Sequence, residues 1–235
     1  MTSSQTQPLR DFTNIKFEIF IAAFTILPFL ILAYFYSQIP NRVPLFLNIT
    51  GEVETWTTKG LISVFRVPLM GLAMQVVFLL LKYGTVQSGT LSPQSTHQRD
   101  YLRLNARLWD WFRGAAAFKM SAESISTIFL SVDRFKSLAQ PTFVFSAIAS
   151  LIGAVGALYY LYRLLVARRD LKARFGDKDE SRPVDKQHVY GRVFYFNRSD
   201  PALFVNRYLF NFANKWTWIF LACILSYPLL VLLPH

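Results

Sequence analysis

Two oppositely charged residues, Lys119 and Glu123, stand four positions apart inside a segment rich in apolar residues. On a helix this spacing puts both side chains on one face, where the ammonium and the carboxylate can form an ion pair. Ser121, Ser124 and Ser126 lie in the same segment and can hydrogen-bond to neighbouring helices. The pattern predicts an intramembrane polar pair.

A second polar group follows the first apolar segment. Pro40 and Pro44 keep the chain extended, and the four residues from Asn48 to Gly51 fit a tight turn, since glycine readily adopts positive φ. One interpretation is a compact hairpin that caps and joins two membrane spans. The other is a binding surface for an external peptide or lipid, made by Asn48, Gly51, Glu52, Trp56 and Lys59.

A third group, between His188 and Asn214, is rich in aromatic residues. Asn197 and Asp200 suit an Asx-type turn that presents neighbouring aromatic side chains on one side. The module is either a lid whose aromatics dip into the membrane interface or a docking site for a cytoplasmic partner. The docking residues would then be Tyr195, Asn197, Asp200 and Arg207.

No pattern of catalytic or metal-binding residues is present. The three histidines are far apart in the sequence, Cys223 is the only cysteine, and there is no HExxH, phosphate-binding loop or nucleophile elbow. We therefore expect no enzyme activity, no cofactor and no metal. The net charge of +11 does not indicate nucleic-acid binding, because the basic residues follow the loops between apolar segments.

The elements that must position these groups are membrane helices. Hydrophobic residues make up 53% of the chain and occur in blocks of about 20, the length that crosses the hydrocarbon core of a bilayer. We predict an all-α polytopic bundle of about five spans, with a short outer hairpin loop and a cytoplasmic aromatic module. The predicted spans are residues 17–36, 61–83, 114–132, 143–164 and 216–233.

The third span is the least apolar of the five. It fits either an amphipathic helix on the membrane surface or a true span whose polar face is shielded within the bundle, and we favour the true span. In the second span, Arg66 lies near one end, so we expect its side chain to reach the headgroups. In the fourth, Gly153 and Gly156 should let helices approach closely.

The distribution of positive charge predicts the orientation. With the N-terminus in the cytoplasm, five spans place 19 Lys and Arg residues inside and 4 outside, a strong asymmetry of the positive-inside kind. We expect a multi-pass protein of the inner (cytoplasmic) membrane with its C-terminus outside. Residues 1–83 form a two-span unit with the outer loop, 84–166 carry spans three and four, 167–215 form a cytoplasmic linker and aromatic module, and 216–235 form the last span.

The outer loop resembles that of a known bacterial family. The run Pro40-x-x-Val43-Pro44, followed by Asn48-x-x-Gly51-Glu52-x-Glu54-x-Trp56-x-x-Lys59, is similar to a membrane domain of unknown function best known from SdpI-type toxin-immunity and signalling proteins. The family pattern has a histidine where this chain has Phe46 and an aromatic residue where it has Leu47. No role that depends on that histidine is carried over.

A second stretch is similar to a module found before the last span of such proteins. Here it reads Tyr190-Gly191-x-x-Phe194-Tyr195-Phe196-Asn197-x-x-Asp200-Pro201, then Phe204-Val205-x-Arg207, with Asn211 or Asn214 as the later asparagine. Arg198 replaces the usual proline, and Tyr208-Leu209 stand where a glycine pair is common.

Three functions remain open. The resemblance implies a non-enzymatic binding, signalling or immunity-type protein that meets an external peptide. The chain would otherwise be an accessory or structural subunit of a larger membrane complex, or a small transporter that uses Lys119 and Glu123. Beyond the lipid bilayer, the expected partner is a protein: an external peptide or neighbouring membrane subunits.

Overall fold

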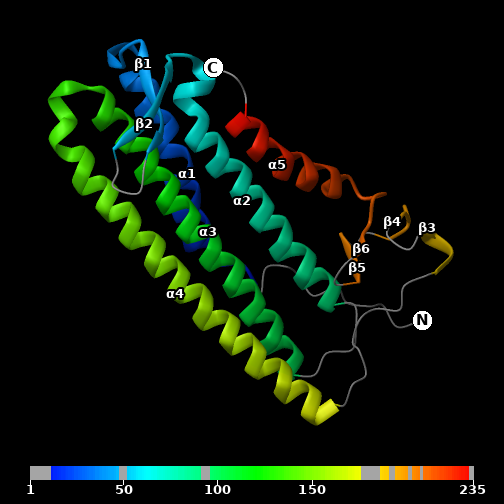
Figure 1. The fold of residues 1–235 in the computed structure, drawn as a ribbon. Helices are drawn as coiled ribbons and strands as arrows, with labels where there is room; N and C mark the ends of the chain where they lie inside the picture. Colours follow the sequence, from blue (N-terminus) through cyan, green and yellow to red (C-terminus); the bar gives the residue numbers. More distant parts are fainter. Residues whose placement is uncertain are drawn as a thin grey trace. The chain divides into compact units, whose positions relative to one another are not determined.

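The computed structural model describes residues 12–47, 52–90, 96–175, 186–190, 194–200, 203–206 and 209–232. This part of the chain is mostly helical, as predicted. Its five α-helices are α1 (Ile15–Phe35), α2 (Leu61–Thr90), α3 (Thr96–Ser131), α4 (Lys136–Phe175) and α5 (Lys215–Leu232) (Figure 1). Three short 3-10 turns, η2 (Tyr36–Gln38), η3 (Asp133–Phe135) and η4 (Lys186–His188), lie between them.

The strands form three small antiparallel pairs in the connections. Strands β1 (Arg42–Leu47) and β2 (Val53–Thr58) make a hairpin between α1 and α2. Between α4 and α5, β3 (Val189–Tyr190) pairs with β4 (Phe194–Tyr195), and β5 (Phe204–Asn206) pairs with β6 (Leu209–Phe210).

Three helices of the described residues are long and apolar enough to cross a membrane, which indicates a membrane protein. These segments are Ile15–Gln38, Leu61–Gln87 and Asp133–Leu171, and they include the first, second and fourth predicted spans. The described part of α5 contains a shorter apolar stretch, Lys215–Ser226.

The third predicted span is helical, but the helix is much longer than the sequence suggested. Helix α3 begins at Thr96, whereas the prediction placed its start at Gly114. The additional turns contain charged residues such as Arg103 and Asp110, so a search for apolar segments does not find them. Helix α3 is more polar than its neighbours, so apolar content alone does not mark its full length.

Contacts divide the chain into two compact units, each described here by itself. One contains residues 15–75, 113–155 and 224–235; the other contains residues 1–14, 76–112 and 156–223. We call them the hairpin unit and the module unit, after the β1–β2 hairpin and the strands β3–β6. Helices α2, α3, α4 and α5 contribute residues to both units.

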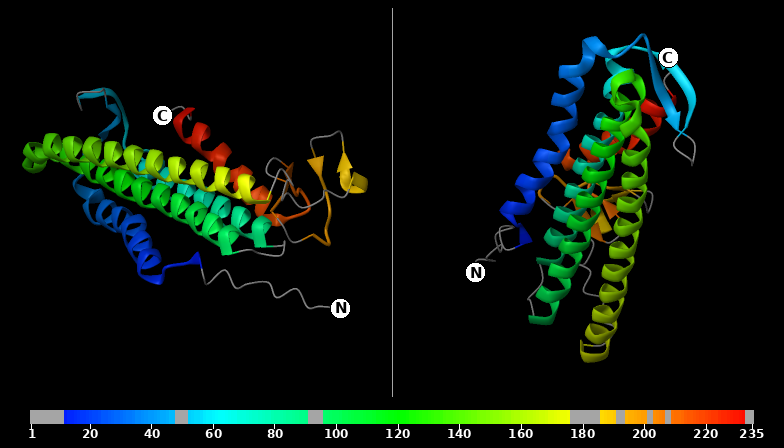
Figure 2. Two further views of the ribbon diagram at one scale, coloured as in Figure 1. Left: turned by 90° about the horizontal axis from the view of Figure 1, so that it is seen from below. Right: turned by 90° about the vertical axis from the view of Figure 1, so that its left-hand side faces the viewer.

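In the hairpin unit, α3 lies between α1 and α4 (Figure 2). Phe118 of α3 stacks on Phe24 of α1 on one side and on Phe145 of α4 on the other, with ring centroids 5.7 and 5.2 Å apart. A Cβ on Gly153 would come within 2.9 Å of the Ala115 Cβ, so this glycine allows α4 to approach α3 closely, as predicted.

The least apolar helix is therefore the most enclosed one in this unit. Ser121, Ser124 and Ser126 are all buried, and the hydroxyl of Ser121 donates to the carbonyl oxygen of Phe24. Helix α4, in contrast, exposes large apolar side chains, among them Phe145, Ile148, Leu151, Ile152 and Val155. Apolar side chains outside and hydrogen-bonded polar groups inside are the arrangement expected in lipid.

In the module unit, aromatic residues pack α2 against α3. The Phe78 ring stacks on both Trp109 and Phe112, with centroids 6.2 and 5.6 Å apart. A Cβ on Gly156 of α4 would overlap the indole ring of Trp111, so the second predicted glycine also serves close packing. A further apolar cluster of Leu80, Leu203 and Phe220 joins α2, the strands and α5.

Candidate functional site

The register of the hairpin decides which side chains it buries. Val43 pairs with Thr57 and Pro44 with Trp56. Because side chains alternate across a strand, Val43 and Thr57 share one face, and both are buried. Val43 joins a core cluster with Leu32, Ile39, Val64 and Ile128. Trp56 therefore lies on the opposite face, where its side chain is 47% exposed.

Lys59 fastens the hairpin to the end of α1. Its ammonium donates to the carbonyl oxygen of Ile39 at 2.7 Å and lies 4.6 Å from the centroid of the Tyr36 ring. Its backbone NH donates to the carbonyl oxygen of Asn41 at 2.8 Å. Lys59, predicted from sequence to bind a ligand, thus has a clear structural role in the hairpin.

Arg66 also supports the hairpin. The sequence suggested that its side chain reaches the headgroups, but the residue is only 6% exposed, and its guanidinium donates to the carbonyl oxygen of Leu45 in β1. The expectation of a headgroup contact was wrong because α2 begins beside the hairpin, whose backbone oxygens offer a nearer acceptor than lipid.

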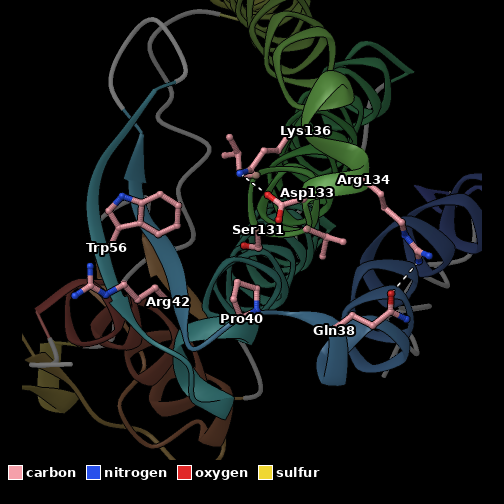
Figure 3. A pocket seen from close by; sticks show the side chains of 10 residues that line it. Gln38, Pro40, Arg42, Trp56, Ser131, Asp133, Arg134 and Lys136 are labelled. Carbon is pink, nitrogen blue, oxygen red and sulfur yellow. Dashed lines mark hydrogen bonds and ion pairs between the residues drawn. The ribbon is translucent and has the colours of Figure 1, made fainter.

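A pocket of about 640 Å³ lies against the hairpin (Figure 3). It is within the size range of small-molecule binding sites. We call it the hairpin pocket. Its lining comes from η2, the hairpin, the end of α3, η3 and the start of α4: Gln38, Pro40, Arg42, Trp56, Leu130, Ser131, Val132, Asp133, Arg134 and Lys136.

Positive charge dominates this lining. Its three cations outnumber the single anion, Asp133, whose carboxylate lies 2.5 Å from the Lys136 ammonium. Arg134 donates to the side-chain oxygen of Gln38 at 2.9 Å and lies 4.5 Å from the centroid of the Phe135 ring. Arg42 is exposed, and within the described residues its guanidinium has no hydrogen-bond or ion-pair partner. A net charge of +2 with one uncommitted guanidinium suits an anionic ligand.

A buried hydroxyl in the lining also indicates a site for a bound ligand. Ser131 is only 8% exposed, and its Oγ has no hydrogen-bond partner among the residues that the structure describes. Figure 3 places its side chain between Pro40 and Asp133. Buried polar groups are normally hydrogen-bonded, so an unsatisfied hydroxyl in a pocket wall is a natural contact for a bound ligand or water.

The pocket includes only one of the five residues predicted for the outer surface. Trp56 lines it, Glu52 is exposed on the hairpin, and Asn48 and Gly51 lie outside the described residues. The sequence interpretation missed Arg42 and the cluster of Ser131, Asp133, Arg134 and Lys136. The available signal was three charged residues in the short connection between the third and fourth predicted spans.

In the aromatic module, the predicted docking residues turn inward. The Tyr195 hydroxyl donates to the Asp200 carboxylate at 3.1 Å, and the side-chain NH2 of Asn197 donates to the Tyr195 hydroxyl at 3.2 Å. Tyr195 is 2% and Asp200 5% exposed. The Asn197 Oδ1 accepts from the Ser199 backbone NH at 2.9 Å, which is the predicted Asx turn. Arg207 lies outside the described residues.

Asn211 is the central residue of this module and is fully buried. Its side-chain NH2 donates to the backbone oxygens of Asn197 and Asp200, at 3.0 and 2.8 Å, and its Oδ1 accepts from the backbone NH of Asn197 at 3.2 Å. Its own carbonyl oxygen accepts from the Thr217 hydroxyl at 2.7 Å, which connects the module to the first turn of α5. Of the two asparagines that the motif allowed, Asn211 therefore holds the module together.

The Lys119 ammonium and the Glu123 carboxylate are in direct contact on α3, and the two side chains are 38% and 32% exposed. A cavity next to this segment, bounded by α1, α2 and α3, has a volume of about 10 Å³. That is room for one water molecule. Neither Lys119 nor Glu123 lines this cavity, so the structure brings the predicted pair together but does not place it at the cavity.

Two more deeply buried ion pairs were not predicted. Both carboxylate oxygens of Glu18 accept from the Arg113 guanidinium, at 2.7 and 2.8 Å, and Arg113 is 4% exposed. In the module unit, Lys82 donates to both carboxylate oxygens of Asp110. Each pair joins α3 to another helix. Because each charge has an opposite charge beside it, burying the charged residues of α3 among apolar neighbours costs less desolvation energy.

A family model supports part of the resemblance. Residues 23–72 match a domain of unknown function, DUF1648, and the match covers most of α1, the whole hairpin and the first part of α2. It does not include the pocket residues contributed by α3, η3 and α4. Neither a curated protein nor a solved structure shows significant similarity to the chain.

Proposed function

We propose that this chain is a non-enzymatic binding protein of the cytoplasmic membrane, which recognises an external peptide at the hairpin pocket and signals to the cytoplasm. The observation that carries the proposal is the pocket itself, with a net positive lining, a half-exposed Trp56 and an exposed Arg42. A peptide that brings a carboxylate beside an apolar or aromatic side chain complements these groups.

The proposal places five spans in the membrane, with α3 as the enclosed one. Burial of Ser121, Ser124 and Ser126 supports this placement, because an amphipathic helix lying on a membrane surface would leave its polar face to water. The apolar surface of α4 also supports this placement, since lipid would cover such a surface in a membrane-spanning bundle.

The orientation follows from the distribution of Lys and Arg, which puts the N-terminus inside and the hairpin pocket outside. In this orientation the α2–α3 connection and the aromatic module face the cytoplasm. The immunity or signalling role rests on the likeness of the hairpin sequence to SdpI-type proteins, and the match of residues 23–72 to DUF1648 supports that likeness at the level of the domain.

Photo-crosslinking in living cells tests the proposal. A photoreactive phenylalanine derivative in place of Trp56 keeps an aromatic ring in the pocket, and it should yield an adduct with a peptide of extracytoplasmic origin, identified by mass spectrometry. The same amino acid in place of Leu151, which is exposed on α4, should yield no peptide adduct. Arg42→Glu should abolish the adduct at position 56. Lipid adducts alone at position 56 would contradict peptide recognition.

If the photoreactive residue at position 151 captures the same membrane protein in every experiment, the alternative of a subunit in a larger complex would be favoured. The third alternative, a transporter built on Lys119 and Glu123, has less support, because neither residue lines the hairpin pocket or the 10 Å³ cavity between α1, α2 and α3.

A further inference from the structure

The aromatic module presents one continuous aromatic surface. Phe194 and Phe196 flank the buried Tyr195, so alternation along the chain puts both on the opposite face, where they are 53% and 42% exposed. Tyr190 pairs with Phe194 across the two strands and is 58% exposed. Tyr190, Phe194 and Phe196 therefore lie on the same exposed face of β3 and β4.

The surface continues to the first turn of α5. The rings of Phe194 and Phe212 have centroids 5.2 Å apart, and those of Phe212 and Trp218 are 5.8 Å apart. Trp218 is 58% exposed, and its indole NH donates to the carbonyl oxygen of Phe212 at 3.0 Å. We call Tyr190, Phe194, Phe196, Phe212 and Trp218 the aromatic patch.

A rigid polar frame lies behind the patch. Asn211 is fully buried and bonds the backbone on both sides of the Asn197 turn, while Tyr195 and Asp200 bond one another beneath β4. These hydrogen bonds hold β4 to the Asn197 turn on the buried face, and the patch rings lie on the opposite, exposed face. An exposed aromatic surface of this kind is more stable in contact with an apolar or interfacial environment than with water alone.

We infer that the aromatic patch is seated in the interfacial layer of the lipid bilayer. Three properties identify lipid as the occupant. Tyr and Trp, with a polar edge and an apolar body, suit the headgroup level. The patch runs directly into α5, whose Lys215–Ser226 stretch is apolar. A cation, Lys215, lies at the start of α5 beside the patch, where it can meet lipid phosphates.

This seating explains why the predicted docking residues face inward. Tyr195, Asn197 and Asp200 shape the module, and its aromatic neighbours make the external contact. The module would then hold the beginning of α5 at a fixed depth, since the Thr217 hydroxyl is bonded to Asn211. The inference stands independently of peptide recognition at the hairpin pocket, because the patch and the pocket share no residue.

Spin labels on the full-length protein test the inference. Cys223→Ser removes the single native thiol, after which Phe196→Cys and Tyr190→Cys each place one label on the patch. Arg198→Cys, on the exposed turn beside the patch, is the matched control. The labelled proteins are reconstituted in vesicles of phosphatidylcholine and phosphatidylglycerol, and the accessibility of each label to oxygen and to a water-soluble nickel chelate is measured.

Both patch labels should be more accessible to oxygen than to the nickel chelate, and the label at position 198 should show the reverse. Patch labels as accessible to nickel as position 198 would overturn the inference. Patch labels shielded from both reagents would also overturn it, since protein and not lipid would then cover the patch. A third measurement avoids cysteine substitution: brominated lipids should quench wild-type fluorescence more than that of Trp218→Phe, and equal quenching would count against the inference.

Discussion

The ammonium of Lys82 donates to both carboxylate oxygens of Asp110, each at 2.8 Å, and only 1% of the Lys82 side chain is exposed. Removing the carboxylate with Asp110→Leu breaks this bidentate contact of a buried ammonium. We expect a loss of about 3–5 kcal/mol in the free energy of unfolding, as for other broken buried pairs. Thermal or denaturant unfolding in mild detergent measures the loss.

Asp100 provides the matched control on the same helix. Its carboxylate lies 3.5 Å from Arg103, and both side chains are more than half exposed. Asp100→Leu should therefore cost less than about 1 kcal/mol. The double variant Lys82→Met with Asp110→Leu should recover much of the stability lost in Asp110→Leu alone. Equal losses at positions 100 and 110 would show that the buried pair has no special role.

Close packing of α4 supplies the second prediction. A Cβ on Gly156 would overlap the Trp111 ring, so Gly156→Leu must displace the indole or the helix. We expect a cost of about 1–3 kcal/mol, typical of overpacked sites. Ala154→Leu adds similar bulk at an exposed position of α4 and should leave the melting temperature nearly unchanged. If both leucine variants melt alike, the close approach is absent.

The sequence predicted the apolar helices α1, α2 and α4 better than the more polar helix α3. Three predicted spans coincide with long apolar helices because a continuous apolar face is a local property of the sequence. The first half of α3 escaped prediction because its charges are compensated by partners distant in the chain, such as Asp110 by Lys82. Sequence spacing gives no information about such contacts.

The hairpin pocket was only partly predictable for the same reason. Trp56 and the hairpin could be inferred from local turn and proline signals. The cations that define the pocket come from separate connections, Arg42 from β1 and Lys136 from the start of α4, and only the fold brings them together. Arg66 illustrates the converse error, since a side chain that sequence reasoning directed to the headgroups donates to a backbone oxygen of the hairpin. Lys59 also donates to a backbone oxygen, that of Ile39, and its predicted role in binding stays a prediction.

Membrane topology is the third prediction. Reporter fusions after Arg107 and after Lys178 should both score cytoplasmic, and a fusion after Lys136 should score periplasmic, because 19 of the Lys and Arg residues then lie inside and 4 outside. The fusions are compared by alkaline phosphatase and green fluorescent protein activity in the same host. A cytoplasmic score after Lys136 would end the five-span arrangement.

The hairpin gives the fourth prediction. Trp56→Ala and Glu52→Ala change exposed side chains, so both variants should express, insert and melt like the parent, with a change of at most about 0.5 kcal/mol. Peptide recognition, read as crosslinking from a photoreactive residue in place of Pro40 in the pocket wall, should be lost in Trp56→Ala, which removes a lining residue, and kept in Glu52→Ala, which lies outside the lining. Val43→Ser, which opens the fully buried core of the hairpin, should instead lower the melting temperature. Loss of the protein itself in the Trp56 and Glu52 variants would favour a purely structural hairpin.

The last prediction concerns Lys119 and Glu123, whose charged groups are in contact on α3. One unpaired charge near the bilayer centre costs about 3 kcal/mol on insertion scales, so the pair must be compensated if α3 spans the membrane. Lys119→Leu and Glu123→Leu each leave one charge without its partner, and each should reduce insertion and stability. The double leucine variant should be harmed less than either single change, because it removes both charges together.

Labelling of a cysteine at position 123 provides the independent measurement. In a Cys223→Ser background, Glu123→Cys should react poorly with a lipid-phase thiol reagent if this face of α3 is turned toward protein. A cysteine replacing Leu151, exposed on α4, should react readily in the same vesicles. Strong labelling at position 123, together with additive effects of the two leucine substitutions, would show that the pair faces lipid. If the pair faces lipid, the transporter alternative loses Lys119 and Glu123, the two residues on which it was based. Helix α3 would then have to be placed at the membrane surface.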